Sequence, residues 1–155
     1  MAAGKSTVAR ALGRRLDWRV EDIDDRIEAR EGRTVASIFS RDGETYFRSV
    51  ERSVLVDLLP LRHAVVATGG GTFVDPENRA LINRDGFSVW LDVPLEELVS
   101  RLPADGRRPL AADREQLERL YAIRRLAYKQ AALRLDAGRA AVDGLVEQVL
   151  DAIAR

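Results

Sequence analysis

The first residues of the chain have the types and spacing of a phosphate-binding loop. Gly4-Lys5-Ser6-Thr7 matches the end of the pattern G-x-x-x-x-G-K-[ST]. In such a loop the glycine lets the backbone approach a phosphate, Lys5 contacts the β and γ phosphates, and the Ser6 hydroxyl binds Mg²⁺. The positive end of the following helix favours the same anion. An exposed helix start with an ordinary lysine is the alternative for this tetrapeptide alone.

Two carboxylates follow a short stretch that we expect to be a strand, residues 18–22. Asp22 and Asp24 would then lie at the carboxyl end of a parallel strand, where open α/β sheets bind ligands. One carboxylate near Mg²⁺ suits a cation that prefers hard oxygen ligands, and the other could accept a hydroxyl proton. A helix N-cap for the segment that follows is the structural alternative, and Asp24 could serve there as well.

Three consecutive glycines, Gly69, Gly70 and Gly71, follow a short apolar run at residues 64–67. Consecutive glycines cost backbone entropy, so they indicate a place where a ligand approaches the main chain closely after a buried strand. A plain flexible loop is the alternative.

Several arginines are candidates for anion binding, because a guanidinium can hold a carboxylate or a phosphate with two parallel hydrogen bonds. Those that we single out are Arg48, Arg107, Arg108, Arg124 and Arg125. Arg48 belongs to an otherwise amphipathic helix, whereas Arg107 and Arg108 fall in a stretch without periodicity. For each arginine taken singly, a solvated surface position is the favoured alternative.

These residues need strands and helices that bring them together. The apolar periodicity and the glycine and proline boundaries predict strands at residues 18–22, 64–67 and 87–91. Periodicity predicts helices at residues 6–16, 24–30, 35–40, 44–59 and 145–153. Boundary residues predict three more: one that begins at Asp75-Pro76 and is followed by Gly86, and one that begins at Pro94. The third begins at a capping box of Asp113 and Gln116 and continues to about Leu133. Short apolar strands that alternate with helices imply a parallel sheet in an α/β fold.

The composition predicts one soluble globular domain. The chain has 155 residues, of which 46% are hydrophobic and 32% charged. Its 25 basic and 25 acidic side chains balance, so nothing attracts it generally to nucleic acid or to an anionic membrane. The lack of cysteine excludes disulfides, thiolate metal sites and thiol catalysis. No apolar run approaches the ~20 residues of a membrane helix, and we expect a cytoplasmic monomer.

The order of the motifs resembles the shikimate kinase family. A phosphate loop, D-x-D, F-R-x-x-E, G-G-G, R-R-P-L and an arginine before a tyrosine follow one another from Met1 to about Leu135. Further matching stretches are DRIEAREGRTVASIF, DGETYFRSVE, VVATGGGTFV and VWLDVPLEELVSRL. The resemblance implies a P-loop kinase fold with three αβα layers and a parallel sheet of strand order 2-3-1-4-5. It also implies one domain over residues 1–155, with a substrate-binding helical region at about 24–60 and a lid at about 103–113.

The resemblance also implies a reaction and a role for each motif residue. The family uses ATP and Mg²⁺ to phosphorylate the 3-hydroxyl of shikimate, a step toward chorismate and the aromatic amino acids. The residues matched to ATP binding are Gly4, Lys5, Ser6, Thr7, Arg101 and Arg108, and those matched to the metal are Ser6 and Asp22. The residues matched to shikimate binding are Asp24, Arg48, Gly69, Gly70, Gly71 and Arg124, and those matched to catalysis are Lys5, Asp24 and Arg108. Phe39, Phe47 and Glu51 match positions that pack the substrate region or orient an arginine.

The sequence departs from the family at its start. The first loop glycine and the strand before it would precede Met1, and that strand is central in the order 2-3-1-4-5. Its loss from a sheet would leave ladder groups unpaired at a cost of ~1–3 kcal/mol each. We therefore expect Met1 to be an internal methionine of a longer kinase.

Two other functions stay open at this point. One is a related P-loop kinase that acts on gluconate or a nucleotide, which the arginine pair, the glycine triplet and the R-P-L motif disfavour. The other is a truncated relic that binds nucleotide weakly or is inactive, which the incomplete loop favours.

Overall fold

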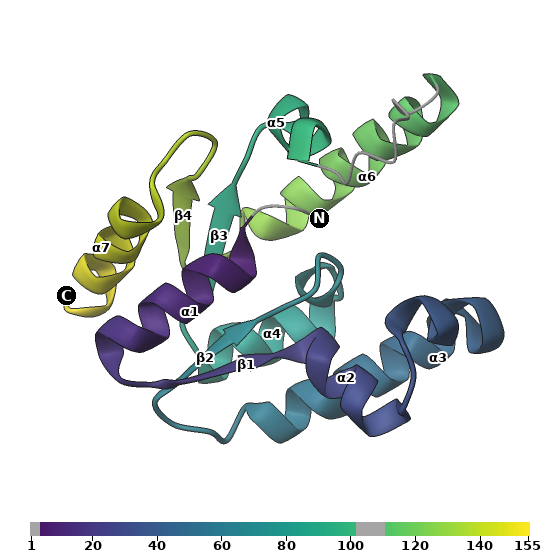
Figure 1. Cartoon of the computed structure of the whole chain (residues 1–155), viewed down its shortest axis with the longest axis horizontal. Helices are drawn as coiled ribbons and strands as arrows, with labels where there is room; N and C mark the ends of the chain where they lie inside the picture. Colours follow the sequence, from purple (N-terminus) through teal and green to yellow (C-terminus); the bar gives the residue numbers. More distant parts are fainter. Residues whose placement is uncertain (1–3, 102–110) are drawn as a thin grey trace. The chain divides into compact units, whose positions relative to one another are not determined.

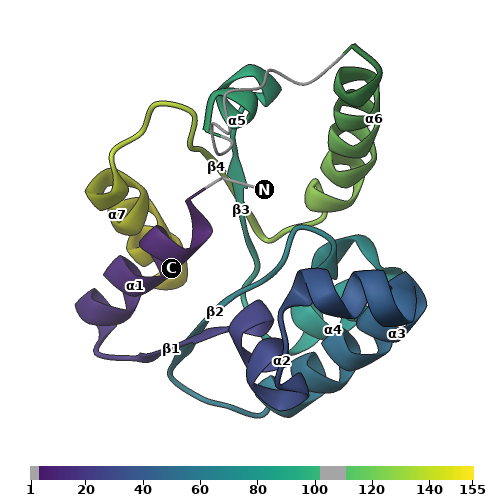
Figure 2. The same ribbon diagram turned by 45° about the vertical axis from the view of Figure 1, so that its right-hand side comes forward.

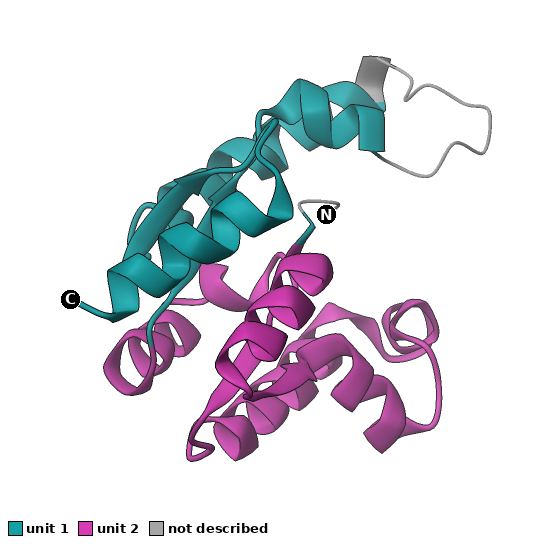
Figure 3. Ribbon diagram, turned by 60° about the vertical axis from the view of Figure 1, so that its left-hand side comes forward, with its two compact units in different colours: residues 1–4, 87–155 teal, residues 5–86 magenta. Residues whose placement is uncertain are grey.

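The computed structural model of the chain describes residues 4–101 and 111–155 (Figure 1). These residues separate into two compact units, which Figure 3 distinguishes by colour. Unit 1 comprises residues 1–4 and 87–155, and unit 2 comprises residues 5–86. In the described part of the chain, no helix is both long and apolar enough to cross a membrane.

Unit 2 carries a parallel pair of strands with helices packed around it. Its elements are α1 (Lys5–Leu16), β1 (Arg19–Asp22), α2 (Ile23–Glu31), α3 (Val35–Leu58), β2 (Ala64–Ala67), the 3₁₀ helix η1 (Thr72–Val74) and α4 (Pro76–Asp85). The register of the pair runs from Arg19 opposite Ala64 to Asp22 opposite Ala67. The carboxyl ends of β1 and β2 therefore lie side by side, and α2 begins directly after β1 (Figure 2).

The core of unit 2 lies between α2 and α3, which pack against each other. Ile23 and Ile27 of α2 are fully buried, as are Ile38 and Val54 of α3. Ile23 and Ile27 are four residues apart, so the helical period places their side chains on the same face of α2. This apolar contact fixes α2, and with it the carboxylates at the start of that helix.

Several helix boundaries that the sequence predicts are confirmed in unit 2. Gly32 ends α2 in the left-handed region, at φ 67°, and its N–H donates to Glu28 O. Gly43 interrupts α3 at φ 84°, which separates the two helices predicted at residues 35–40 and 44–59. The side chain of Asp75 accepts hydrogen bonds from the backbone of Glu77 and Asn78, so it caps α4 as expected.

Unit 1 carries a second parallel pair of strands. Its elements are β3 (Val89–Asp92), α5 (Leu95–Arg101), α6 (Ala111–Tyr128), β4 (Leu133–Asp136) and α7 (Val142–Ile153). The pair β3 and β4 runs in register from Val89 opposite Leu133 to Asp92 opposite Asp136. Buried Leu145, Val146 and Val149 lie on α7, at the spacing of one helix face.

Three sequence predictions in unit 1 are wrong. The helix predicted to reach about Leu133 ends at Tyr128, and Leu133 instead opens β4, which was not predicted. The predicted capping box fails because α6 already begins at Ala111, which places Asp113 inside the first turn. The strand predicted at 87–91 lies two residues later at its start, over Val89–Asp92.

The α/β class with parallel strands is confirmed. The four strands of the described residues form two separate parallel sheets, β1 with β2 and β3 with β4. In the order 2-3-1-4-5, the strand numbered 2 lies next to strand 3, and strand 4 lies next to strand 5. The two pairs in the structure correspond to these two pairings. The single domain, the substrate region and the lid stay predictions, and most of the predicted lid, residues 103–110, lies outside the described residues.

Candidate active site

Ser6, at the end of the predicted phosphate loop, forms a hydrogen bond with Asp22, the first of the two candidate carboxylates. Ser6, in the first turn of α1, donates a hydrogen bond of 3.4 Å from Oγ to Asp22 Oδ2. The other oxygen of Asp22 accepts from the backbone N–H of Asp25 at 3.1 Å and thereby caps α2. The metal-site expectation and the helix-cap alternative are thus compatible, since each uses a different carboxylate oxygen. Lys5 begins α1, Thr7 is exposed on it, and Gly4 precedes it at φ 84°.

The carboxyl of Asp24 has a raised pKa. Partial burial raises the pKa of its carboxyl above the ordinary value of 3.8, and the negative charges of Asp22, Glu51 and Glu28 raise it further. The positive charge of Lys5 acts in the opposite direction. A raised pKa brings a carboxylate closer to the range in which it can accept a proton near neutral pH.

The glycine triplet forms a tight turn that touches two of the candidate residues. The turn is closed by hydrogen bonds from Thr72 N to Gly69 O and from Val74 N to Gly71 O, both 3.2 Å long. A β-carbon on Gly69 would lie 3.3 Å from Asp24 Oδ1, so the backbone of the turn lies against that carboxylate. A β-carbon on Gly71 would lie 2.5 Å from Arg48 Nη2. The guanidinium therefore occupies the space that a side chain at position 71 would need, and any larger residue there would displace it.

Arg48 is held in place by a buried carboxylate. Its Nη1 donates to both oxygens of Glu51, at 3.0 and 3.1 Å, and Glu51 is 1% exposed. The guanidinium also lies 5.2 Å from the ring centre of Phe47, whose ring packs against Phe39 at 4.5 Å. The side chain of Arg48 is still 32% exposed, so part of its guanidinium faces solvent.

Two buried polar residues in unit 2 were missed by the sequence analysis. Thr72 donates a hydrogen bond of 2.9 Å from Oγ1 to Glu51 Oε2, and Asn78 donates one of 3.1 Å from Nδ2 to Thr72 O. Both side chains are at most 1% exposed. The position of Thr72 directly after the glycine triplet was the one available signal, because neither threonine nor asparagine is distinctive in a sequence.

The remaining candidates belong to unit 1. Arg124 is half-buried on α6, and its charge opposes the effect of burial, which raises the pKa of the Tyr128 hydroxyl. Arg101 ends α5, and its Nη2 donates to Gly138 O at 3.0 Å. Arg107 and Arg108 lie outside the described residues, so their roles stay predictions.

Arg125, the neighbour of Arg124, has a structural partner. Its Nη1 donates to Oδ1 of the buried Asp92 at 2.6 Å and to the hydroxyl of Tyr121 at 3.1 Å. Arg134 donates from Nε to the other oxygen of Asp92, at 2.7 Å. Arg125 was a candidate for anion binding in the sequence. In the structure its hydrogen bond to Asp92 connects α6 with β3.

The donor set beside the phosphate loop fits a hard cation. Ser6 Oγ and Asp22 Oδ2 are oxygen donors close enough to share one ion. Within the residues that the structure describes, no three His, Cys, Asp or Glu side chains converge as a metal site. A cation that takes few protein ligands and keeps several waters, as Mg²⁺ does, suits such a pair.

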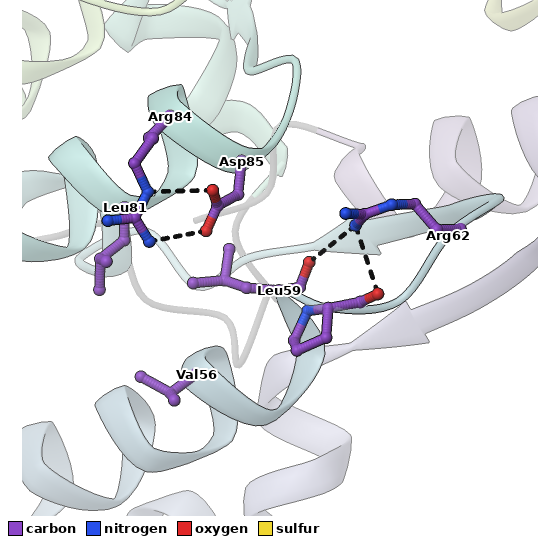
Figure 4. A pocket seen from close by; sticks show the side chains of 7 residues that line it. Val56, Leu59, Arg62, Leu81, Arg84 and Asp85 are labelled. Atoms are coloured by element: carbon purple, nitrogen blue, oxygen red, sulfur yellow. Dashed lines mark hydrogen bonds and ion pairs between the residues drawn. The ribbon is translucent and has the colours of Figure 1, made fainter.

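A shallow pocket elsewhere in unit 2 is separate from these residues. Its volume is about 300 Å³, and it is lined by Val56, Leu59, Pro60, Arg62, Leu81, Arg84 and Asp85. Figure 4 shows that the charged groups at its rim are bonded, Arg84 to Asp85 and Arg62 to backbone oxygens. None of the candidate site residues lines it.

Comparison with known sequences identifies a family. The family model described as shikimate kinase matches residues 1–154. A shikimate kinase of Persephonella marina is 36% identical over 154 residues, which cover 99% of this chain and 94% of the relative. A shikimate kinase of Burkholderia lata is 41% identical over 154 residues, which cover 97% of this chain and 84% of the relative.

Solved structures agree with the sequence relatives. The shikimate kinase of Aquifex aeolicus has a TM-score of 0.90 at 30% identity, and the match covers 99% of this chain and 92% of that one. The shikimate kinase of Acinetobacter baumannii in complex with shikimate has a TM-score of 0.90 at 33% identity, with 99% and 88% covered. The fold predicted from the motifs is therefore confirmed.

Proposed function

This chain belongs to the shikimate kinase family, whose members are ATP-dependent kinases, and we propose that it transfers the γ-phosphoryl group of ATP to the 3-hydroxyl of shikimate. The products are shikimate 3-phosphate and ADP. The observation that carries the proposal is the turn at Gly69–Gly71, which lies beside both groups: a β-carbon on Gly69 would be 3.3 Å from Asp24 Oδ1, and one on Gly71 would be 2.5 Å from Arg48 Nη2. One turn thus presents a group for hydroxyls and a group for a carboxylate, and shikimate carries both.

Asp24 acts as the base. The hydroxyl oxygen forms a bond to the γ-phosphorus, and the bond from that phosphorus to the bridging oxygen breaks, so that ADP leaves with the electron pair. The hydroxyl proton passes to a carboxylate oxygen of Asp24 and then to solvent. The raised pKa of Asp24 supports this role, because its carboxylate is a better proton acceptor than an ordinary aspartate.

Arg48 binds the substrate carboxylate, a role that the motif order also gives to Arg124. Both oxygens of Glu51 accept from Nη1 of Arg48, so we assign Nη2 to the ligand. A guanidinium whose position is fixed before binding loses less side-chain entropy when it meets a carboxylate. Gly70 contributes its backbone beside the substrate.

The loop residues Gly4, Lys5, Ser6 and Thr7 bind the phosphates of ATP. Ser6 and Asp22 would hold Mg²⁺, directly or through water, and the ion would neutralise charge on the transferred phosphoryl group. Lys5 supplies a positive charge for the same phosphates, and the charge of Lys5 also lowers the pKa of Asp24, which supports a position near that carboxyl. Arg108 would reach the transferred phosphate, and Arg101 would lie on the adenine side.

The setting of the enzyme is also part of the proposal. We place it in the cytoplasm, where its co-substrate ATP is available, as a monomer that acts without nucleic acid or membrane. The whole chain would work as one domain, with the substrate-binding region at about 24–60 and the lid at about 103–113.

A substrate panel tests the proposal. The purified chain is given ATP and Mg²⁺ with shikimate, gluconate or nucleoside monophosphates, and ADP release is followed. We expect release that depends on shikimate alone. Release with gluconate or a nucleotide instead would support the related-kinase alternative, and nucleotide binding without release would support an inactive relic.

A further inference from the structure

Thr72 is the residue on which the further inference rests. We propose that its side-chain hydroxyl is a positioning group for shikimate binding, which acts through Glu51 on Arg48, and that Asn78 holds Thr72 in place. The inference builds on the proposed function, because it concerns the arginine that is assigned there to the substrate carboxylate. It adds two residues that touch neither substrate in that assignment.

The first step is the contact between Thr72 and Glu51. The hydroxyl donates to Oε2 of Glu51 at 2.9 Å, and Thr72 is 0% exposed. Glu51 accepts from Nη1 of Arg48 on the same carboxylate. A buried carboxylate needs donors for its oxygens, and these two residues supply them from different elements, η1 and α3.

The second step is the anchoring of Thr72 itself. Asn78 donates from Nδ2 to the carbonyl oxygen of Thr72 at 3.1 Å and accepts from Arg52 Nε at 3.1 Å. Arg52 in turn pairs with Asp75, the cap of α4, at 2.7 Å. This chain of bonds is complete, since no buried side-chain nitrogen or oxygen in the described residues lacks a partner.

The consequence concerns the direction of the Arg48 guanidinium. The hydroxyl of Thr72, the first residue of η1 after the glycine turn, donates to Oε2 of Glu51, and Nη1 of Arg48 donates to the same carboxylate. These two donors fix the plane of the Glu51 carboxylate. The guanidinium can then lie flat against Gly71, where a β-carbon would meet three of its atoms within 2.8 Å. Without the hydroxyl, Glu51 can rotate and Arg48 loses its single orientation.

The test compares two substitutions at position 72, one that removes the hydroxyl and one that keeps it. Thr72→Val keeps the shape of the side chain and removes the hydroxyl, whereas Thr72→Ser keeps the hydroxyl and removes the methyl group. For Thr72→Val we expect the KM for shikimate to rise about tenfold with the KM for ATP unchanged, since one hydrogen bond to a charged group is worth about a factor of ten or more. Thr72→Ser should stay within about twofold of the wild type for both substrates, because its hydroxyl can still reach Glu51.

A purely structural role for Thr72 would give a different result. It would lower the melting temperature of both variants and leave the KM for shikimate unchanged in the folded fraction. An unchanged KM in folded Thr72→Val, an equal rise in the KM for ATP, or an equal defect in Thr72→Ser would each overturn the proposal.

A second variant decides the case if Thr72→Val does not fold. Arg52→Gln alters a partly exposed residue and releases Asn78, so we expect a rise of about threefold in the KM for shikimate and none for ATP. An unchanged KM there would overturn the proposal. The wild-type chain is measured in the same assay: if it does not turn over shikimate, the proposed function fails and this inference with it, whereas turnover with unchanged variants rejects this inference alone.

Discussion

At the scale of single residues, the candidate site brings several carboxylates of like charge close to Asp24. Asp24 lies near Asp22, Glu28 and Glu51, and its burial and their charges all disfavour its ionised form. The folded chain therefore binds this proton more tightly than the unfolded chain does. Between the ordinary value of 3.8 and the raised pKa, the free energy of unfolding decreases as the pH rises. An ionised carboxylate in this environment therefore reduces the free energy of unfolding at neutral pH.

The first prediction separates these two effects. Asp24→Asn should lower kcat by about 10²–10⁴-fold, because the hydroxyl proton loses its acceptor, and should leave ATP binding intact. The same variant should be more resistant to urea than the wild type at pH 7, and this gain should shrink as the pH falls toward 3.8. Turnover like that of the wild type would remove Asp24 from the mechanism. Equal stability at pH 7 would show that the ionised carboxylate does not destabilise the fold.

The second prediction concerns the space beside Arg48. Gly71→Ala places a methyl group 2.5 Å from Nη2, so the guanidinium must move. We expect the KM for shikimate to rise about tenfold, the change that loss of one charged hydrogen bond produces.

A glycine outside the site provides the control for that variant. A β-carbon on Gly144, which lies on α7, would have no neighbouring atom within 4 Å, so Gly144→Ala should leave both KM values unchanged. It should also add about 0.5–1 kcal/mol to the free energy of unfolding, because alanine favours a helix. Equal kinetic constants in Gly71→Ala and wild type would show that Arg48 does not depend on this space.

The residue types of the site could be read from the sequence, but their partners could not. Motif order singled out Asp22, Asp24, Arg48 and the glycine triplet, since each belongs to a short recognisable pattern. Thr72 carries no such pattern, and its role depends on a carboxylate 21 positions away in the chain. Contacts of this kind arise from the packing of elements rather than from local sequence.

At the scale of elements, β1, α2 and β2 position the site of unit 2. The parallel register places Asp22 opposite Ala67, just before the glycine turn. The predicted strand at residues 64–67 is confirmed residue for residue because it is a short apolar run bounded by glycine. β4 was missed because Leu133–Asp136 follows alanines that favour a helix and becomes a strand through its pairing with β3.

The third prediction concerns the junction of α6 with β3. Arg125 is one of two arginines that neutralise Asp92, whose residue is 5% exposed. Arg125→Gln should lower the free energy of unfolding by about 1–3 kcal/mol, since the buried carboxylate would retain Arg134 alone. Urea denaturation followed by circular dichroism measures this change.

A surface arginine on the same helix is the matched control. Arg119 pairs with Glu115 at 3.4 Å, and both side chains are at least 70% exposed. Arg119→Gln should change the free energy of unfolding by no more than about 0.5 kcal/mol. If Arg125→Gln costs no more than this control, the Asp92 junction does not stabilise unit 1.

At the scale of the whole molecule, the binding of anionic substrates depends on local charge rather than on net charge. The chain balances 25 basic and 25 acidic side chains, so its preference for two anionic substrates must come from particular groups. Lys5 and Arg48 are such groups in unit 2, and Arg124 is the corresponding candidate in unit 1. All three residues lie within residues 1–154, the part of the chain that the shikimate kinase family model matches.

The most direct test of the central claim identifies the product. The purified chain is incubated with ATP, Mg²⁺ and shikimate, and phosphorus and proton NMR follow the phosphate ester while ADP is measured in parallel. The account predicts one phosphate ester per ADP, with the phosphate on the 3-hydroxyl of shikimate. ADP without an ester, an ester at another hydroxyl, or no ADP that depends on shikimate would contradict it.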